Sequence, residues 1–378
     1  MIPLNQNLTG LKRSMIRVYT NMAREIPDCA MLTIGEPDFD TPEAIKTAAM
    51  AALNAGQTHY APNQGTAALR KAVAEYETAR GNTVTAEQVL ITVGATQALY
   101  TAFLGILNPG EEVIVPTPGF GLYESLATVA GARMVPLDVT KTGFQITKEA
   151  LEAAITPRTK AILINSPCNP TGVVLSKESL ANVKAAVLGR PIFVICDNVY
   201  NRLTYGETCP DLTLDPELKE QLILCQSFSK PWAMTGWRVG YLTCPDYVME
   251  RLLLLSAVTI AAVPTFLQEA AVAALQEDPT PMKEVYRKRR EYVCRRLRDM
   301  GLSFPEPEGA FYVFPNIEKY GLDSAEFCTR MIREGKVAAV PGSCFGAEGY
   351  IRLSYCYSDA ELKKGLDRME DFIRMLEA

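Results

Sequence analysis

The chain is almost devoid of histidine, with only His59 among its 378 residues. A zinc site built on several histidines is therefore improbable, and a Ser-His-Asp triad would have to use that one residue. This scarcity argues against histidine-based hydrolytic and metal chemistry. We expect no metal site.

Paired cysteines are also missing, although the chain has ten cysteines. None stands in a Cys-x-x-Cys pair, and a disulfide framework is typical of small secreted domains rather than of a chain of this length. Cys196 and Cys225 lie inside apolar runs. We expect such cysteines to behave as small buried hydrophobic residues in a reducing cytosol.

Long apolar runs and long basic runs are absent as well. Residues 1–5 contain no apolar signal core, and the four leucines at positions 252–255 are far too few to span a bilayer. The longest basic run, positions 287–290, sits in a helical pattern, and the net charge is -5. A solvated helix face explains that run better than a nucleic-acid site does. We expect a cytoplasmic protein without a nucleic-acid or membrane partner.

The length and the pattern of the chain indicate two domains with ample core. Hydrophobic residues make up 48% and charged residues 21%, which is ordinary for a globular protein. From about residue 64 to 240, short apolar runs alternate with helical patterns, as in a mostly parallel sheet covered by helices. We expect strands near residues 89–93, 112–115, 161–164, 193–196, 222–225 and 239–242, with a helix over 95–107.

Beyond about residue 245 the pattern turns helical, with a long amphipathic segment over about 279–300. Short apolar runs near 310–314, 337–342 and 350–354, with a helical stretch over 323–334, predict a small α+β domain. The domains are expected to be residues 45–280 (large) and residues 1–44 with 281–378 (small).

Chemically useful residues follow the predicted strands. In an open parallel sheet, ligands bind beyond the carboxyl ends of the strands. Alone, each residue there is more typical of a helix cap or a turn. Their occurrence at successive strand ends favours a site made of Ala95 and Thr96 at a helix start, Phe120, Asn169, Asp197 with Tyr200, and Lys230.

The motif Ser227-Phe228-Ser229-Lys230 is followed by Arg238 in Gly236-Trp237-Arg238-Val239-Gly240. An amine among hydroxyls and a guanidinium suits a phosphorylated aldehyde. Pyridoxal 5′-phosphate has these needs, because it forms a Schiff base with an amine and carries an anionic phosphate. A lysine at a strand end is commonly only solvated, so this motif alone does not decide between the two interpretations.

Over essentially its whole length the sequence resembles the class I aminotransferases, which are pyridoxal-phosphate enzymes of fold type I. It looks most like the bacterial aspartate, aromatic and N-acetyl-diaminopimelate aminotransferases. The resemblance rests on Gly35-Glu36-Pro37-Asp38-Phe39, Tyr60 with Gly65 and Leu69-Arg70, Asn169-Pro170-Thr171-Gly172, Asp197 with Tyr200, the lysine and arginine motifs above, and Ile351-Arg352-Leu353-Ser354.

The resemblance implies a large domain with a seven-stranded sheet and transfer of an amino group between an L-amino acid and a 2-oxo acid. The expected donors are aspartate, an aromatic amino acid or a related one, with 2-oxoglutarate as acceptor. Lys230 would bind the cofactor and move the substrate proton. Asp197 would face the pyridine nitrogen, where a carboxylate keeps that nitrogen protonated.

The other roles follow from the same resemblance. Asn169 and Tyr200 would hydrogen-bond the phenolic oxygen of the ring, and Phe120 would stack on its face. Arg352 would take the substrate carboxylate as a bidentate pair, with Gly35 and Asn169 nearby. The phosphate would be bound by Ala95, Thr96, Ser227, Ser229, Arg238 and, from the other subunit of a homodimer, Tyr60.

Two positions depart from the pattern of the relatives. Asn198 stands where many have glutamate, with a slight expected effect on the cofactor. Thr96 stands where one aspartate-using subgroup has a lysine for the distal carboxylate, which weakens a dicarboxylate preference.

Two other functions remain open at this point. A carbon–sulfur β-lyase acting on cystathionine-like substrates would use the same lysine. A cofactor-binding sensor in a transcription regulator is less favoured, since the forty-odd residues before the large domain leave no room for a DNA-binding module.

Overall fold

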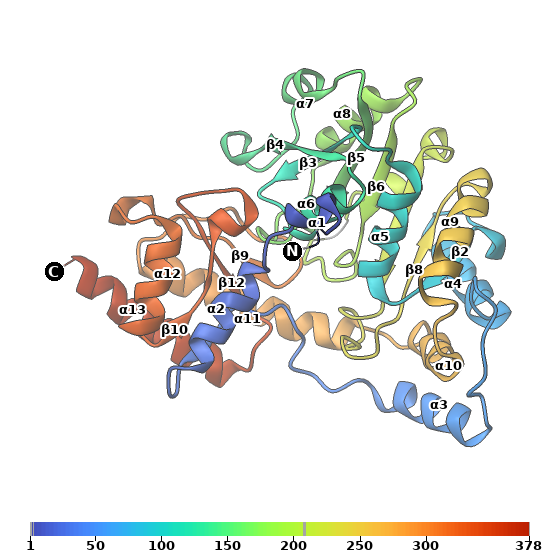
Figure 1. The fold of residues 1–378 in the computed structure, drawn as a ribbon. Coiled ribbons are helices and arrows are strands. Elements are labelled where there is room, and N and C mark those ends of the chain that lie inside the picture. Colours follow the sequence, from blue (N-terminus) through green and yellow to red (C-terminus); the bar gives the residue numbers. More distant parts are fainter. Residues whose placement is uncertain (1, 3, 207–208, 378) are drawn as a thin grey trace.

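The protein is described here by a computed structural model that covers residues 2, 4–206 and 209–377 (Figure 1). Its largest sheet has seven strands in the order β2-β8-β7-β6-β5-β3-β4. All neighbours from β7 to β4 are parallel, and only β8 runs the other way. The expected mostly parallel seven-stranded sheet is thus confirmed. The strands are β2 Val89–Thr92, β3 Glu112–Thr117, β4 Arg133–Asp138, β5 Thr159–Asn165, β6 Phe193–Asp197, β7 Leu222–Ser227 and β8 Gly240–Thr243.

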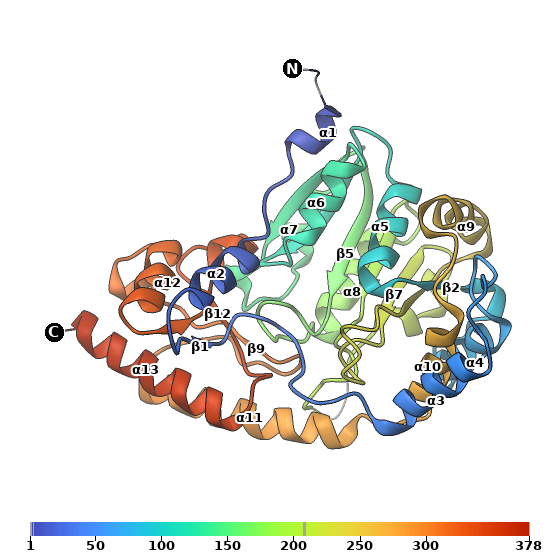
Figure 2. The same ribbon diagram turned by 60° about the horizontal axis from the view of Figure 1, so that its bottom comes forward.

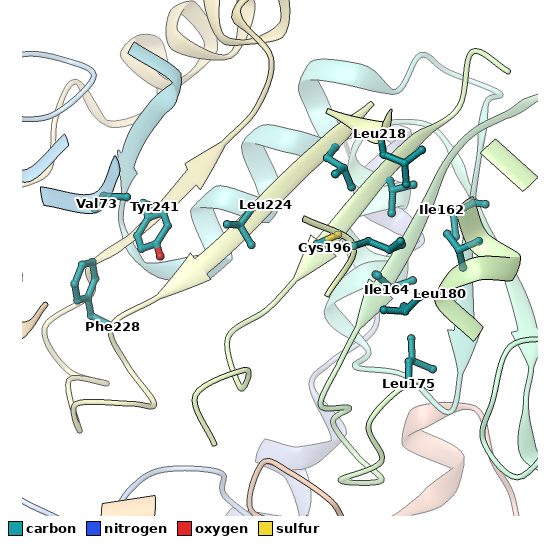
Figure 3. Close-up of a cluster of buried hydrophobic side chains, with 14 of the residues drawn as sticks. Val73, Ile162, Ile164, Leu175, Leu180, Cys196, Leu218, Leu224, Phe228 and Tyr241 are labelled. Atoms are coloured by element: carbon teal, nitrogen blue, oxygen red, sulfur yellow. The ribbon is translucent and has the colours of Figure 1, made fainter. Parts of the chain in front are cut away.

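Helices cover both faces of this sheet, and alternate residues of each strand enter opposite cores. In β5, Ile162 and Ile164 join one hydrophobic cluster (Figure 3), whereas Ala161 and Leu163 join another. The first cluster includes residues of α3 Glu43–Asn54, α4 Ala67–Ala79, α7 Lys148–Ala154, α8 Lys177–Val187 and α10 Thr265–Ala274. The second includes residues of α5 Gly94–Ile106, α6 Leu122–Val129 and α9 Asp246–Ile260.

The strand β4 has no counterpart among the apolar runs expected from the sequence. It lies at the edge of the sheet, contains Pro136, and most of its side chains are at least partly accessible. An edge strand is covered on fewer sides than a central one and tolerates proline, so its sequence lacks a continuous apolar run.

The C-terminal part builds a separate hydrophobic cluster on small sheets. Its strands are β1 Ala30–Met31, paired with β10 Val337–Ala338, and β11 Val340–Pro341, β12 Ile351–Ser354 and β9 Tyr312–Val313 in a second sheet. The helices α11 Thr280–Asp299, α12 Ser324–Arg333 and α13 Asp359–Glu377 surround them. Figure 2 shows α11 running along the base of the molecule from the side of α10 toward α13.

The N-terminal segment contacts both parts of the molecule. The helix α2 Met15–Arg24 and β1 contribute to the C-terminal cluster, but α1 Gln6–Thr9 lies against α6, and Lys12 pairs with Glu124 at 2.8 Å. The expected boundary after residue 44 also falls inside α3. The division into residues 45–280 and residues 1–44 with 281–378 remains a proposal, supported by the separate cores.

Short 3-10 segments complete the chain: η1 Ala86–Gln88, η2 Thr140–Thr142, η3 Leu212–Leu214, η4 Pro216–Leu218, η5 Glu318–Tyr320 and η6 Gly342–Phe345. Among the described helices, none has both the length and the apolar character needed to span a bilayer.

Candidate active site

A cavity of about 260 Å³ opens where β5, β6 and β7 end, as the rule for parallel sheets predicts. Among the residues that line it are all the predicted site residues except Tyr60: Gly35, Ala95, Thr96, Phe120, Asn169, Asp197, Tyr200, Ser227, Ser229, Lys230, Arg238 and Arg352. Tyr60 lies elsewhere, and its side chain is 94% exposed.

Lys230 lies in the turn that follows β7, and its amine points into this cavity. The amine donates a hydrogen bond to the carbonyl oxygen of Gly35 at 2.6 Å. Burial lowers the pKa of Lys230 to about 8, opposed by Cys356 and Glu36. The site therefore holds an amine that is neutral and nucleophilic at a lower pH than an ordinary lysine.

Asp197 is the last residue of β6 and is buried. One of its carboxylate oxygens accepts a hydrogen bond, and the other has no partner among the described residues. Its Oδ2 accepts a hydrogen bond from Tyr123 Oη at 2.7 Å, whereas Oδ1 has no donor among the described residues. Burial raises the pKa of Asp197 to about 6, and the Tyr123 hydrogen bond acts against this. A buried carboxylate oxygen without a partner fits a ligand that brings a cationic N–H group.

A first group of donors that could bind an anion lies at the N-terminus of α5. No side chain caps this helix, so the first backbone N–H groups are free to bind an anion. Ser227 Oγ and Ser229 Oγ lie 2.8 Å apart, and Arg238 completes the group without an ion pair to any described residue. Gly94 adopts φ +66, and a Cβ there would meet Arg238 Nη2 at 2.9 Å. The positive φ favours glycine, which also leaves room for the guanidinium.

Arg352, on β12, forms a second anion site. The guanidinium is 1% exposed and has no carboxylate partner among the described residues. It donates to Asn169 Oδ1 at 2.8 Å and to the carbonyl oxygen of Thr33, and its Nε has no acceptor. Its carbon Cζ lies 4.5 Å and 4.9 Å from the ring centroids of Tyr312 and Phe345. An unpaired guanidinium held between two rings is prepared for a planar carboxylate.

Tyr200 lies in the cavity between Asp197 and Arg352. Its hydroxyl lies 2.8 Å from the hydroxyl of Tyr312, and both side chains are buried. Since Asn169 Oδ1 accepts from Arg352, the amide nitrogen of Asn169 remains available as a donor. The phenol of Tyr200 and the amide of Asn169 therefore provide two donors for an oxygen bound between Asp197 and Arg352.

The cavity thus combines a nucleophilic amine, a carboxylate with an unpaired oxygen and two separate anion sites. Comparison with known families decides the interpretation: residues 27–369 match the family model described as aminotransferase class I and II. The chain belongs to this family. It is an aminotransferase.

Sequence relatives and solved structures agree with this assignment. The aminotransferase is 40% identical to the probable N-acetyl-LL-diaminopimelate aminotransferase of Bacillus subtilis, over 98% of this chain and 95% of the relative. It is 38% identical to aromatic-amino-acid aminotransferase 2 of Thermococcus litoralis, over 98% of each. The aspartate aminotransferase of Thermus thermophilus with maleate superposes with a TM-score of 0.94 at 36% identity, covering 98% of this chain and all of that one (100%). None of these relatives favours the β-lyase or the sensor.

Sequence reasoning overlooked several residues of the aminotransferase cavity. Asn165 ends β5, donates to the carbonyl oxygen of Asp197 at 2.8 Å and accepts from the backbone N–H of Asn169 at 2.9 Å. Its place at a strand end could have revealed it. Tyr123 and Tyr312 carried no such signal, since one lies in a helix and the other in a strand.

Proposed function

We propose that this aminotransferase binds pyridoxal 5′-phosphate on Lys230 and moves an amino group between an L-amino acid and a 2-oxo acid, with 2-oxoglutarate as acceptor. When bound, this cofactor supplies an aldehyde for amines and an electron-withdrawing ring. One observation carries the proposal: the amine of Lys230 and two unpaired guanidinium groups face a single cavity. Two anions, the cofactor phosphate and the substrate carboxylate, match those two cations.

Around the ring, each residue has a distinct task. Asp197 would keep a proton on the pyridine nitrogen through its unpaired oxygen, and Tyr123 orients that carboxylate. Asn169 and Tyr200 would donate to the phenolic oxygen, and Phe120 would cover one face of the ring. The phosphate would be bound at the N-terminus of α5 by Ala95, Thr96, Ser227, Ser229 and Arg238.

The substrate is oriented by Arg352 and then deprotonated by Lys230. A bidentate pair between Arg352 and the α-carboxylate fixes the α-hydrogen relative to the ring, with Gly35 beside it. Lys230 Nζ, as a free amine, would carry the proton from the α-carbon.

The test is a set of half-reactions with the cofactor-loaded enzyme. A series of L-amino acids, including aspartate and aromatic ones, is added without acceptor, and the visible absorption of the cofactor is followed. We expect productive donors to convert the aldehyde form to the amine form, and 2-oxoglutarate to restore it. Release of pyruvate and ammonia from cystathionine, with no conversion by any donor, would contradict transamination.

We further propose a cytoplasmic homodimer in which Tyr60 reaches the phosphate of the partner's site. The exposure of Tyr60 and its absence from its own chain's cavity support this. Mixing Lys230→Ala and Tyr60→Ala chains should regenerate an intact site in the mixed dimer. Activity no higher than that of the separate variants would contradict the crossing.

Replacing Arg352 by glutamine should raise KM about 30- to 1,000-fold for every amino donor alike, because a buried charge pair with the common carboxylate is lost. Arg352→Lys should show a smaller rise in KM than Arg352→Gln but not the wild-type value, since an ammonium cannot form the bidentate pair. Steady-state kinetics on three unrelated donors measure this, with the exposed Arg17→Gln as control. A rise in KM for only one donor would show instead that Arg352 contacts the side chain of that donor and not the α-carboxylate.

Cofactor uptake should depend on pH through the amine of Lys230. The neutral amine attacks the aldehyde, and burial lowers the pKa of Lys230 to about 8. The uptake rate of the cofactor-free protein should therefore rise with pH and level off above about 8, as followed by absorbance after rapid mixing. A midpoint near 10.4, the value of an unperturbed lysine, would show that the amine is solvated.

A further inference from the structure

A second cavity of about 300 Å³ adjoins the active site. Ile16, Phe120 and Leu122 line both cavities, so the two cavities are neighbours that share these side chains. Phe345 provides another link, because its ring contacts the guanidinium of Arg352 while the residue also lines the second cavity. The ring of Phe345 thus lies between the guanidinium of Arg352 and the second cavity.

The two cavities differ in whether a cationic side chain is left without an anionic partner. In the first, the phosphate and the α-carboxylate account for Arg238 and Arg352, and no further cation except Lys230 lines it. In the second, Lys12 is paired with Glu124 at 2.8 Å. Arg13 also lines the second cavity and forms no ion pair with any residue the structure describes. An anionic group at the far end of a substrate would find its partner there.

We infer that the second cavity receives the side chain of the amino donor and that Arg13 binds an anionic group at its end. This rests on the proposed function. The preferred donors are L-amino acids with an unbranched side chain that ends in a carboxylate and is longer than that of aspartate. The first cavity has no cation left for the distal carboxylate of a shorter donor such as aspartate, once Arg238, Arg352 and Lys230 have their assigned partners.

The side chains between the two cavities agree with this class of substrate. The shared residues Ile16, Phe120 and Leu122 are apolar, which suits methylene groups and not a charge. Because Arg13 is exposed, solvent screens its pair with a carboxylate. We therefore expect its contribution to be about tenfold in affinity, at the low end for a charge-assisted hydrogen bond.

The experiment uses the cofactor-loaded enzyme and two matched series of ligands. Amino donors of equal length, 2-aminoadipate against norleucine and 2-aminopimelate against 2-aminoheptanoate, give the ratio of kcat/KM for acidic over neutral side chains. Unreactive straight-chain dicarboxylates of increasing length, from succinate to suberate, give affinities by calorimetry. Both series are measured for wild type, Arg13→Gln and Arg17→Gln. Arg17 is an exposed arginine of the same segment that lines neither cavity.

In wild type we expect the acidic donor to be favoured and dicarboxylate affinity to rise beyond succinate. Arg13→Gln should lower both the kcat/KM ratio and the affinity of the long dicarboxylates about tenfold, whereas Arg17→Gln should change them less than threefold. Equal ratios in wild type and Arg13→Gln, or equal losses in both variants, would overturn the assignment of Arg13. If no amino acid of the series, acidic or neutral, converts the cofactor even in wild type, the proposed function itself is wrong.

Discussion

Replacement of Lys230 by alanine is expected to reduce kcat by at least about 10⁴-fold with any amino donor. The variant loses both the amine that binds the cofactor and the base that moves the α-proton, and proton transfer alone contributes up to about that factor. Single-turnover absorbance measurements with saturating cofactor quantify the remaining rate. Turnover comparable to wild type would remove Lys230 from the mechanism.

The loss should not come from unfolding. The buried amine has its pKa lowered to about 8, so at pH 7 the unfolded chain offers it a better environment than the folded one. Folding stability of the cofactor-free wild type is therefore expected to rise with pH between about 8 and the unfolded value near 10.4. The cofactor-free Lys230→Ala variant should lack this rise and melt no lower than wild type at pH 7. A lower melting temperature would assign the loss to instability.

Replacement of Asp197 by asparagine is expected to lower kcat/KM about 10²- to 10⁴-fold. The amide cannot hold a proton on the pyridine nitrogen, so the ring withdraws electrons less effectively. Asp197 Oδ1 has no hydrogen-bond partner among the described residues, so this oxygen is the one available to the pyridine nitrogen. Kinetics with a good amino donor, at cofactor concentrations that saturate each variant, provide the measurement.

Tyr123→Phe is the graded comparison for Asp197. It removes only the hydrogen bond of 2.7 Å to Oδ2 and leaves the charge in place. We expect about a tenfold effect, in keeping with the value of one hydrogen bond to a charged group. If Asp197→Asn were no more harmful than Tyr123→Phe, the carboxylate would serve only to position its neighbours.

The sequence predicted the centre of the site because the chemistry lies at strand ends. Asp197 ends β6, and Lys230 follows β7, so short apolar runs locate them. Tyr312 could not be found in this way. Its hydroxyl meets that of Tyr200 only in the folded chain, because the two residues are 112 positions apart in the sequence.

The same reasoning explains the other omissions. Tyr123 is buried beside Asp197 through the packing of α6, and its sequence neighbourhood is that of an ordinary amphipathic helix. Arg13 precedes α2 in a polar segment, and only the closeness of that segment to α6 brings it near the cavity. Local patterns thus predicted most strands of the large sheet and the residues at their ends, whereas contacts between distant segments required the folded chain.

The central claim is that the amine of Lys230 binds the aldehyde of pyridoxal 5′-phosphate. Borohydride reduction of the cofactor-loaded enzyme converts such a linkage into a stable secondary amine, and peptide mass spectrometry then locates it. We expect a single phosphopyridoxyl group on the peptide that contains Lys230. Labelling of another lysine, or no labelling in enzyme that shows transamination, would contradict the account.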